Sequence, residues 1–228
     1  MSHNKWVVEK YEEPWPHIVI DNFYDDYMWD YIIQNIVNNE KKYFSQWKER
    51  FRHGFEPDIP LRAKRPYRGL LYNDRMIQKG KRRSYEPHDD PILTDYFLTH
   101  VGEDFMKDNF KLHRSYSDSS VLYPYVACKY NHQQYGRHRI HDELLTKVQS
   151  CCSYISPEHN TGTIIFDTNK EFYKVITWKP NRALIFAPIN NVTWHDFMQT
   201  EKSPERIALD FFLSRPANEI DLPMISSE

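Results

Sequence analysis

The chain has few residues of the kinds that define disulfide-stabilised or low-complexity proteins. Among 228 residues there are only 6 Gly and 3 Cys, which excludes a glycine-rich linker protein and argues against a disulfide framework. Two of the cysteines, Cys151 and Cys152, are adjacent in an apolar run, so we expect reduced, buried thiols. No segment is apolar for long enough to cross a bilayer, and the first residues lack the apolar run of a signal peptide. These absences predict a cytoplasmic protein with no membrane partner.

Net charge is also nearly absent. A formal charge of -2 provides no overall attraction to nucleic acid or to an anionic membrane, so it argues against nucleic acid as a partner. The local exception is the segment 62–83, which is dense in Lys and Arg. It has two interpretations: a solvated surface segment, or a basic lid that meets an anionic substrate.

The length suits one domain, residues 1–228, and we divide it by pattern into three parts. The first part, 1–120, contains a predicted strand at 17–21 and a predicted amphipathic helix at 25–39. A second helix is predicted over 88–110, where Asp89 or Asp90 can cap it and Pro91 suits its first turn. Its apolar stripe consists of Leu93, Phe97, Val101 and Phe105.

The second part, 121–214, changes to short strands separated by turn signals, and the third, 215–228, is a C-terminal tail. The predicted strands are 121–131, 148–156, 161–167, 172–178, 182–188, 192–197 and 206–213. Many short strands at this spacing indicate a sandwich or a barrel-like jelly roll. The sequence therefore predicts an α+β fold whose β core carries the chemistry.

The stretch "RIHDELLTK" at 139–147 contains a histidine and two carboxylates. Side chains alternate along extended backbone, so His141 and Glu143 share a face while Asp142 points away. Downstream, His195 in another predicted strand adds a second imidazole, which completes the ligand set of non-haem Fe(II) oxygenases. If the last two strands form a hairpin, Arg206 lies opposite His195 and can grip a carboxylate with two hydrogen bonds.

A resemblance rests on three segments: "YNHQQYGRHRIHDELLTKVQSCCSYISPEHNTGTIIFD", "VITWKPNRALIFAPINNVTWHDF" and "RIALDFFL". Together they resemble the 2-oxoglutarate/Fe(II)-dependent dioxygenases, in particular the prolyl-4-hydroxylase-like branch, over about 121–214. The segment "PWPHIVIDNFY" is similar to the opening strand of that branch. The fold so implied is a double-stranded β-helix, a cupin-like jelly roll, with N-terminal helices packed on one sheet.

The resemblance also implies roles for single residues. His141, Glu143 and His195 fall on the family's metal motif and would bind Fe(II), with no catalytic residue beyond these ligands. Arg206 falls on the arginine that binds the cosubstrate 2-oxoglutarate. Tyr130 is a candidate for supporting that cosubstrate, and Lys147 is a weaker one. The implied reaction hydroxylates a small-molecule or peptide substrate and releases succinate and CO2, with ascorbate as the reductant.

Two departures from the family keep a second interpretation open. Most relatives have Asp where this chain has Glu143, and many have Ser or Thr where it has Ala208. These differences favour, as the alternative, a non-catalytic cupin-like protein that binds a metal or a small ligand. A third and weaker idea, oxidative demethylation of nucleic acid, comes only from the basic segment 62–83.

Overall fold

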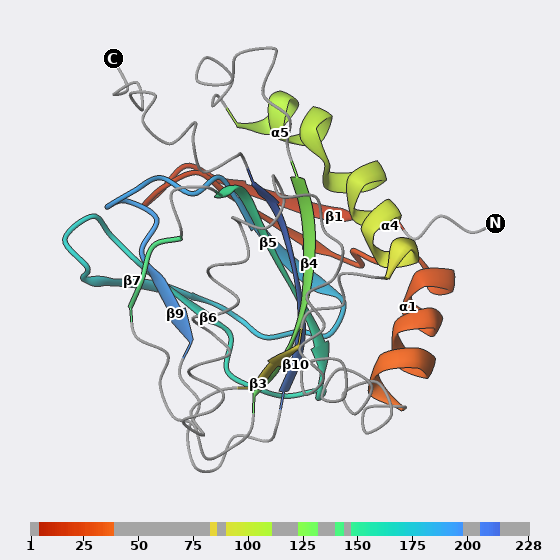
Figure 1. The fold of residues 1–228 in the computed structure, drawn as a ribbon. Coiled ribbons are helices and arrows are strands. Elements are labelled where there is room, and N and C mark those ends of the chain that lie inside the picture. The colour runs from red at the N-terminus through yellow and green to blue at the C-terminus, as the bar shows by residue number, and fades with distance from the viewer. Residues whose placement is uncertain are drawn as a thin grey trace, which may run out of the picture.

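The computed structural model describes residues 5–38, 83–85, 90–110, 123–131, 140–143, 147–197 and 206–214. Within these ranges the chain forms two antiparallel β-sheets and a group of helices (Figure 1). The predicted mixture of helices and sheet is therefore confirmed. None of the described helices is long and apolar enough to span a lipid bilayer.

The larger sheet has seven strands and carries most of the core. Its order is β1 (Val7–Tyr11), β2 (His17–Asp21), β8 (Arg182–Phe186), β5 (Lys147–Ser156), β10 (Arg206–Ser214), β4 (Tyr123–Asn131) and β3 (Arg83–Tyr85). β1 and β3 were not predicted. The sheet takes strands from both sides of residue 120, so the N-terminal part of the chain contributes to the same sheet as the β core.

The smaller sheet has three strands in the order β7 (Phe172–Ile176), β6 (Thr163–Phe166) and β9 (His195–Phe197). It packs against the inner face of the larger sheet, and the shared apolar cluster contains Tyr154, Leu184 and Phe186 from one side and Ile165 and Ile176 from the other. All seven strands predicted between 121 and 213 are found, with shorter bounds at several ends.

The helices cover the opposite face of the larger sheet. They are α1 (Asp26–Ile32), which continues as the π-helical turn η1 (Ile33–Val37), α4 (Pro91–Val101) and α5 (Glu103–Asn109). Phe97 of α4 stacks on Phe211 of β10 with ring centroids 4.9 Å apart. Figure 1 shows α1, α4 and α5 on one side of the sheet and β6, β7 and β9 on the other. The prediction that the helices pack on one sheet is therefore confirmed.

The prediction of one continuous helix over 88–110 is wrong, because Gly102 separates α4 from α5. Its backbone is extended (ψ -157°), and a Cβ added there would lie 2.2 Å from the carbonyl oxygen of Leu98. Of the two caps that the sequence left open, Asp90 is the N-cap of α4, and its side chain accepts a hydrogen bond from Leu93 N at 3.1 Å. Leu93, Phe97 and Val101 of the predicted stripe are fully buried.

Candidate functional site

The two histidines predicted from the sequence lie side by side. A short antiparallel bridge joins His141 to His195, with N–H···O distances of 3.1 Å and 2.9 Å in the two directions. Their ring centroids are 4.3 Å apart. Since β6 holds β9 by pairing Ile165 with His195, this bridge adds residue 141 to the other side of β9. The backbone thus places two imidazoles at the β9 edge of the smaller sheet.

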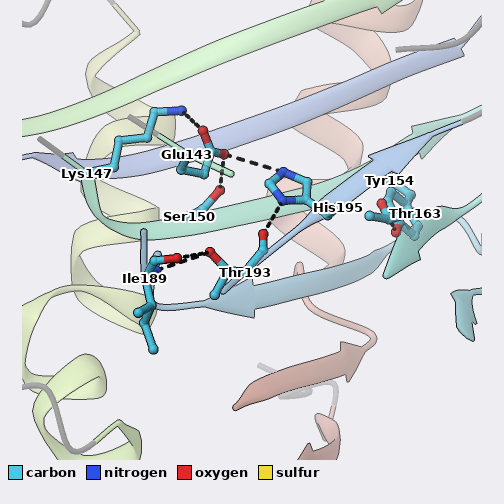
Figure 2. Close-up of polar contacts among 8 residues, drawn as sticks. All are labelled: Glu143, Lys147, Ser150, Tyr154, Thr163, Ile189, Thr193 and His195. Carbon is cyan, nitrogen blue, oxygen red and sulfur yellow. Dashed lines mark hydrogen bonds and ion pairs between the residues drawn. The ribbon is translucent and has the colours of Figure 1, made fainter. Parts of the chain in front are cut away.

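Glu143 faces the same site, as the alternation of side chains predicted. Its Oε1 lies 3.8 Å from Nε2 of His195 (Figure 2). Asp142 is directed elsewhere, and its Oδ2 accepts a hydrogen bond from the backbone N–H of Asn191 at 2.7 Å. The two carboxylates thus point in different directions, as the alternation predicted, and the choice of Glu143 as a ligand stays a prediction.

The orientation of His195 is fixed by the loop before β9. Nδ1 of His195 lies 2.9 Å from the carbonyl oxygen of Thr193, so Nδ1 carries the proton of that hydrogen bond. In the neutral ring the lone pair is then on Nε2, the atom that faces Glu143. Thr193 is itself anchored, because its hydroxyl exchanges hydrogen bonds with the N–H and C=O of Ile189 at 3.1 Å and 3.2 Å (Figure 2).

The carboxylate of Glu143 is bound by two side chains of β5. Lys147 Nζ lies 2.6 Å from Oε2, and the hydroxyl of Ser150 donates to Oε1 at 3.0 Å. Lys147 also lies over the ring of Phe212, 3.3 Å from its centroid. The contact of Lys147 is thus with a candidate metal ligand, and its predicted role at the cosubstrate stays a prediction. Ser150 was not predicted.

The donor types fit ferrous iron, but as placed they do not form a ligand set. Among the described residues, no group of three or more His, Cys, Asp or Glu is arranged to hold a metal ion. Two donors at right angles on one ion, each at about 2.1 Å, lie about 3 Å apart. Glu143 Oε1 and His195 Nε2, which are 3.8 Å apart, would have to approach by about 0.8 Å, within reach of a side-chain rotation. The donor types thus suit the metal, and its binding by His141, Glu143 and His195 stays a prediction.

Arg206 lies between the two sheets and is nearly inaccessible to solvent, with 3% of its surface exposed. Its guanidinium carbon lies 4.0 Å from the ring centroid of Phe197 and 5.1 Å from that of Trp178. Nη1 donates to the carbonyl oxygen of Thr161 at 3.3 Å, while Nε has no hydrogen-bond partner among the described residues. Burial lowers the pKa of Arg206. A buried cation with an unsatisfied N–H favours an anionic ligand.

The predicted hairpin between the last two strands is wrong. β10 is flanked on both sides, by β4 and by β5, so no edge remains at which β9 could pair with it. β9 pairs with β6 in the other sheet. Arg206 instead approaches the histidine strand across the space between the sheets, through Phe197, which follows His195 by two residues on the same face.

A buried pair of hydroxyl groups near Arg206 was missed by the sequence analysis. Tyr154 of β5 donates to Thr163 of β6 at 2.7 Å, and its ring stacks on Trp178 with centroids 4.7 Å apart. Burial raises the pKa of Tyr154, so it stays a protonated donor. Figure 2 shows this pair on the side of His195 away from Glu143. The sequence signal that could have indicated Tyr154 is the alternation of side chains along β5, which places Ser150, Cys152 and Tyr154 on one face.

The close approach of β6 to β7 supports this hydroxyl pair. Gly162 lies between Thr161 and Thr163. The carbonyl oxygen of Thr161 accepts the hydrogen bond from Arg206, and the hydroxyl of Thr163 accepts the one from Tyr154. A Cβ added at Gly162 would lie 1.7 Å from the carbonyl oxygen of Ile176, so no larger residue fits without moving one strand.

Two of the sequence-based hypotheses concern parts of the chain that the structure does not describe. The backbone of Tyr130 pairs with Ile207 in β10, but its side chain is not described. The basic segment 62–83 lies outside the described residues except for the backbone of Arg83, which begins β3. Their roles stay predictions.

Comparison with known proteins gives structural likenesses only. No family model matches the chain, and no curated protein matches it. One similar solved structure is a viral collagen prolyl hydroxylase from Paramecium Bursaria Chlorella virus-1 in complex with 2OG, with a TM-score of 0.46 and 13% identity over 88% of this chain and 96% of that one. A second is a Pseudomonas putida prolyl-4-hydroxylase, with a TM-score of 0.46 and 11% identity over 88% of this chain and 93% of that one. A third is an oxidoreductase of the 2OG-Fe(II) oxygenase family from Burkholderia pseudomallei, with a TM-score of 0.38 and 11% identity over 57% of each chain. At these low values the likeness assigns no activity to this chain.

Proposed function

We propose that the protein is a 2-oxoglutarate- and Fe(II)-dependent dioxygenase that hydroxylates a small-molecule or peptide substrate. The observation that carries the proposal is the backbone bridge between His141 and His195, with Glu143 Oε1 3.8 Å from His195 Nε2. Two imidazoles and one carboxylate are the protein ligands of non-haem Fe(II) oxygenases. We further propose that the two facing sheets form a double-stranded β-helix, the jelly roll expected from the sequence.

His141, Glu143 and His195 would hold the iron, and the side chains of Glu143 and His195 are each oriented by neighbouring residues. Thr193 keeps the lone pair of neutral His195 on Nε2, and Lys147 and Ser150 hold the carboxylate of Glu143. When bound, Fe(II) and 2-oxoglutarate together supply the oxidising chemistry, with O2 as the oxidant and succinate and CO2 as products beside the hydroxylated substrate. The described residues supply orientation, charge and exclusion of water.

Arg206 would bind the carboxylate of 2-oxoglutarate that lies away from the metal. Its burial strengthens the attraction to an anion, and the ligand would satisfy the Nε–H that has no partner among the described residues. Trp178 and Phe197 flank the guanidinium and exclude water from it. The hydroxyl groups of Tyr154 and Thr163 are the nearby neutral donors, and they take the place of the hydroxyl that Ala208 does not provide.

The first test is succinate production from 2-oxoglutarate in the presence of Fe(II) and ascorbate. We expect release above a no-enzyme control even without the true substrate, since such enzymes turn over part of their cosubstrate uncoupled. His141→Ala and Glu143→Gln should each abolish Fe(II) binding and succinate release, because each removes a ligand. Asp142→Asn, an isosteric change at a residue bonded to Asn191, should preserve both. An equal loss from Asp142→Asn would count against the ligand assignment.

The alternative is a cupin-like protein that binds a metal or a small ligand without turnover. The observation that favours it is that Glu143 is engaged by Lys147 and Ser150 while the described donors do not form a ligand set as placed. Tight metal binding with no succinate release under any of the conditions above would favour this function over the dioxygenase.

A further inference from the structure

The carboxylate of Glu143 is held by two donors that come from one strand and bond to different oxygens. Lys147, at the start of β5, bonds to Oε2, and Ser150, three residues later, bonds to Oε1. Oε1 is also the atom that faces Nε2 of His195 (Figure 2). The two oxygens of Glu143 therefore have different surroundings: one faces a candidate ligand, and the other faces an ammonium group.

Burial makes these contacts stronger than the usual lysine–glutamate pair. The side chains of Lys147 and Glu143 are 15% and 9% exposed, and Ser150 is 3% exposed. Lys147 is also held over the ring of Phe212, so it has two separate attachments. The pair Lys107–Glu103 on α5 has the same sequence spacing and an N···O distance of 2.7 Å, but both its side chains are 51% exposed. Such exposed pairs contribute little.

A glutamate needs such restraint more than an aspartate does. Its additional methylene adds one rotatable bond between the backbone and the carboxylate, which must be fixed whenever the group binds an ion. Partners that orient a metal ligand commonly change metal affinity by about 10- to 100-fold when they are removed.

We propose that Lys147 and Ser150 are positioning residues that make Glu143 a one-oxygen ligand, with Oε1 directed to the metal ion and Oε2 held away from it by the ammonium group. This inference rests on the proposed function, since it takes Glu143 as a ligand. It assigns to β5 the role of adapting a glutamate to a position where relatives of this kind have an aspartate. The prediction of Lys147 as a cosubstrate residue stays a prediction, and the contact of Lys147 with Glu143 is what supports the positioning role.

The test is a Co(II) titration of the full chain without 2-oxoglutarate, followed by visible absorption, which reports both affinity and coordination. Lys147→Met should weaken Co(II) binding by about 10- to 100-fold and should shift the absorption bands, because Oε2 becomes able to bind the ion. Lys147→Arg, which keeps the charge and the donors, should restore the wild-type spectrum and most of the affinity. Lys107→Met is the matched control, and it should leave both unchanged.

Ser150→Ala is the second variant. If circular dichroism shows that Lys147→Met is unfolded, Ser150→Ala tests the positioning role in its place. It should also weaken Co(II) binding, because Oε1 loses the hydrogen bond from Ser150. If folded Lys147→Met binds Co(II) as tightly as wild type or more tightly, the inference is overturned, because Lys147 would then act only as a competing positive charge. Unchanged or tighter binding by Ser150→Ala would overturn it as well. Failure of the wild-type chain to bind Co(II), or full binding by Glu143→Gln, would instead overturn the proposed function.

Discussion

Arg206 is a cation that the fold places where solvent does not reach, in contact with two aromatic rings and one carbonyl and attracted by the carboxyl of Asp210 on the same strand. Desolvation of this charge outweighs the attraction of Asp210, so the buried cation lowers the stability of the fold and is most easily explained by a ligand that binds to it. The aromatic rings keep water away and thereby increase the gain when an anion arrives.

Replacement of this residue should separate binding from stability. We expect Arg206→Met to weaken 2-oxoglutarate binding by at least about 100-fold, the usual loss when a buried charge partner is truncated, while Mn(II) affinity stays within a few-fold of wild type. The ligand-free variant should melt no lower than the wild-type chain, because a buried charge has been removed. Calorimetric titrations with Mn(II) and then 2-oxoglutarate, together with thermal melts, check both parts. Unchanged 2-oxoglutarate affinity would refute the role of Arg206.

His17 is a second buried titratable residue, and it determines part of the pH dependence of stability. It is 1% exposed, its Nδ1 bonds to the carbonyl of Trp15 at 2.8 Å, and burial lowers its pKa to about 4. The unfolded chain, with a histidine pKa near 6.5, therefore binds a proton between about pH 6.5 and 4 that the folded chain does not. This proton uptake by the unfolded chain lowers the free energy of unfolding as the pH falls from about 6.5 to about 4, and it has no effect above that range.

The comparison of wild type with His17→Gln measures this contribution. From pH 7 to pH 4 the wild-type free energy of unfolding should fall by on the order of 2 kcal/mol more than that of the variant. Urea unfolding at several pH values provides the measurement. Parallel pH profiles for the two proteins would show that His17 does not carry this proton linkage.

At the scale of elements, the side chain of Asp90 joins two helices. It caps α4 through Leu93 N and accepts a hydrogen bond from the hydroxyl of Tyr31 in α1 at 3.0 Å. Burial and the neighbouring carboxylate raise the pKa of Tyr31 to about 12. One carboxylate therefore helps to place both helices on the outer face of the sheet.

Loss of this carboxylate should cost more than loss of an ordinary cap. Asp90→Ala should lower the free energy of unfolding by about 1–3 kcal/mol, because a helix cap and a partly buried hydrogen bond disappear together. Asp90→Asn keeps a side-chain oxygen for Leu93 N and should cost less. Chemical denaturation of the three proteins makes the comparison, and an Asp90→Ala variant as stable as wild type would contradict it.

Local signals in the sequence were sufficient for most elements and for part of the site. Alternation of side chains separated Glu143 from Asp142, and capping preferences narrowed the helix cap to Asp89 or Asp90, of which Asp90 is the cap. What the sequence did not indicate depends on pairing between distant strands. The hairpin proposed for Arg206 assumed that neighbours in sequence pair, whereas β10 lies between β4 and β5. Tyr154 and Thr163 meet only because β5 and β6 belong to different sheets that pack face to face.

At the scale of the whole molecule, the site lies where the two sheets meet. The larger sheet contributes Arg206, Tyr154, Ser150 and Lys147, and the smaller contributes His195 and Thr163. Its position depends on the packing of one sheet on the other, so changes in the shared apolar cluster will act on the site as well as on stability. The single-domain prediction agrees with this dependence and stays a prediction.

The His141–His195 bridge has a consequence for the order in which the molecule assembles. It closes a loop of 54 residues (195 less 141) within a fold dominated by pairings between remote strands, and such contacts form late and slowly. Before β9 pairs with β6, His141 and His195 are not held next to each other. This applies to a chain that is still being synthesised and to one whose folding has stalled. If the chain binds a metal as proposed, capture of that ion would mark the end of folding.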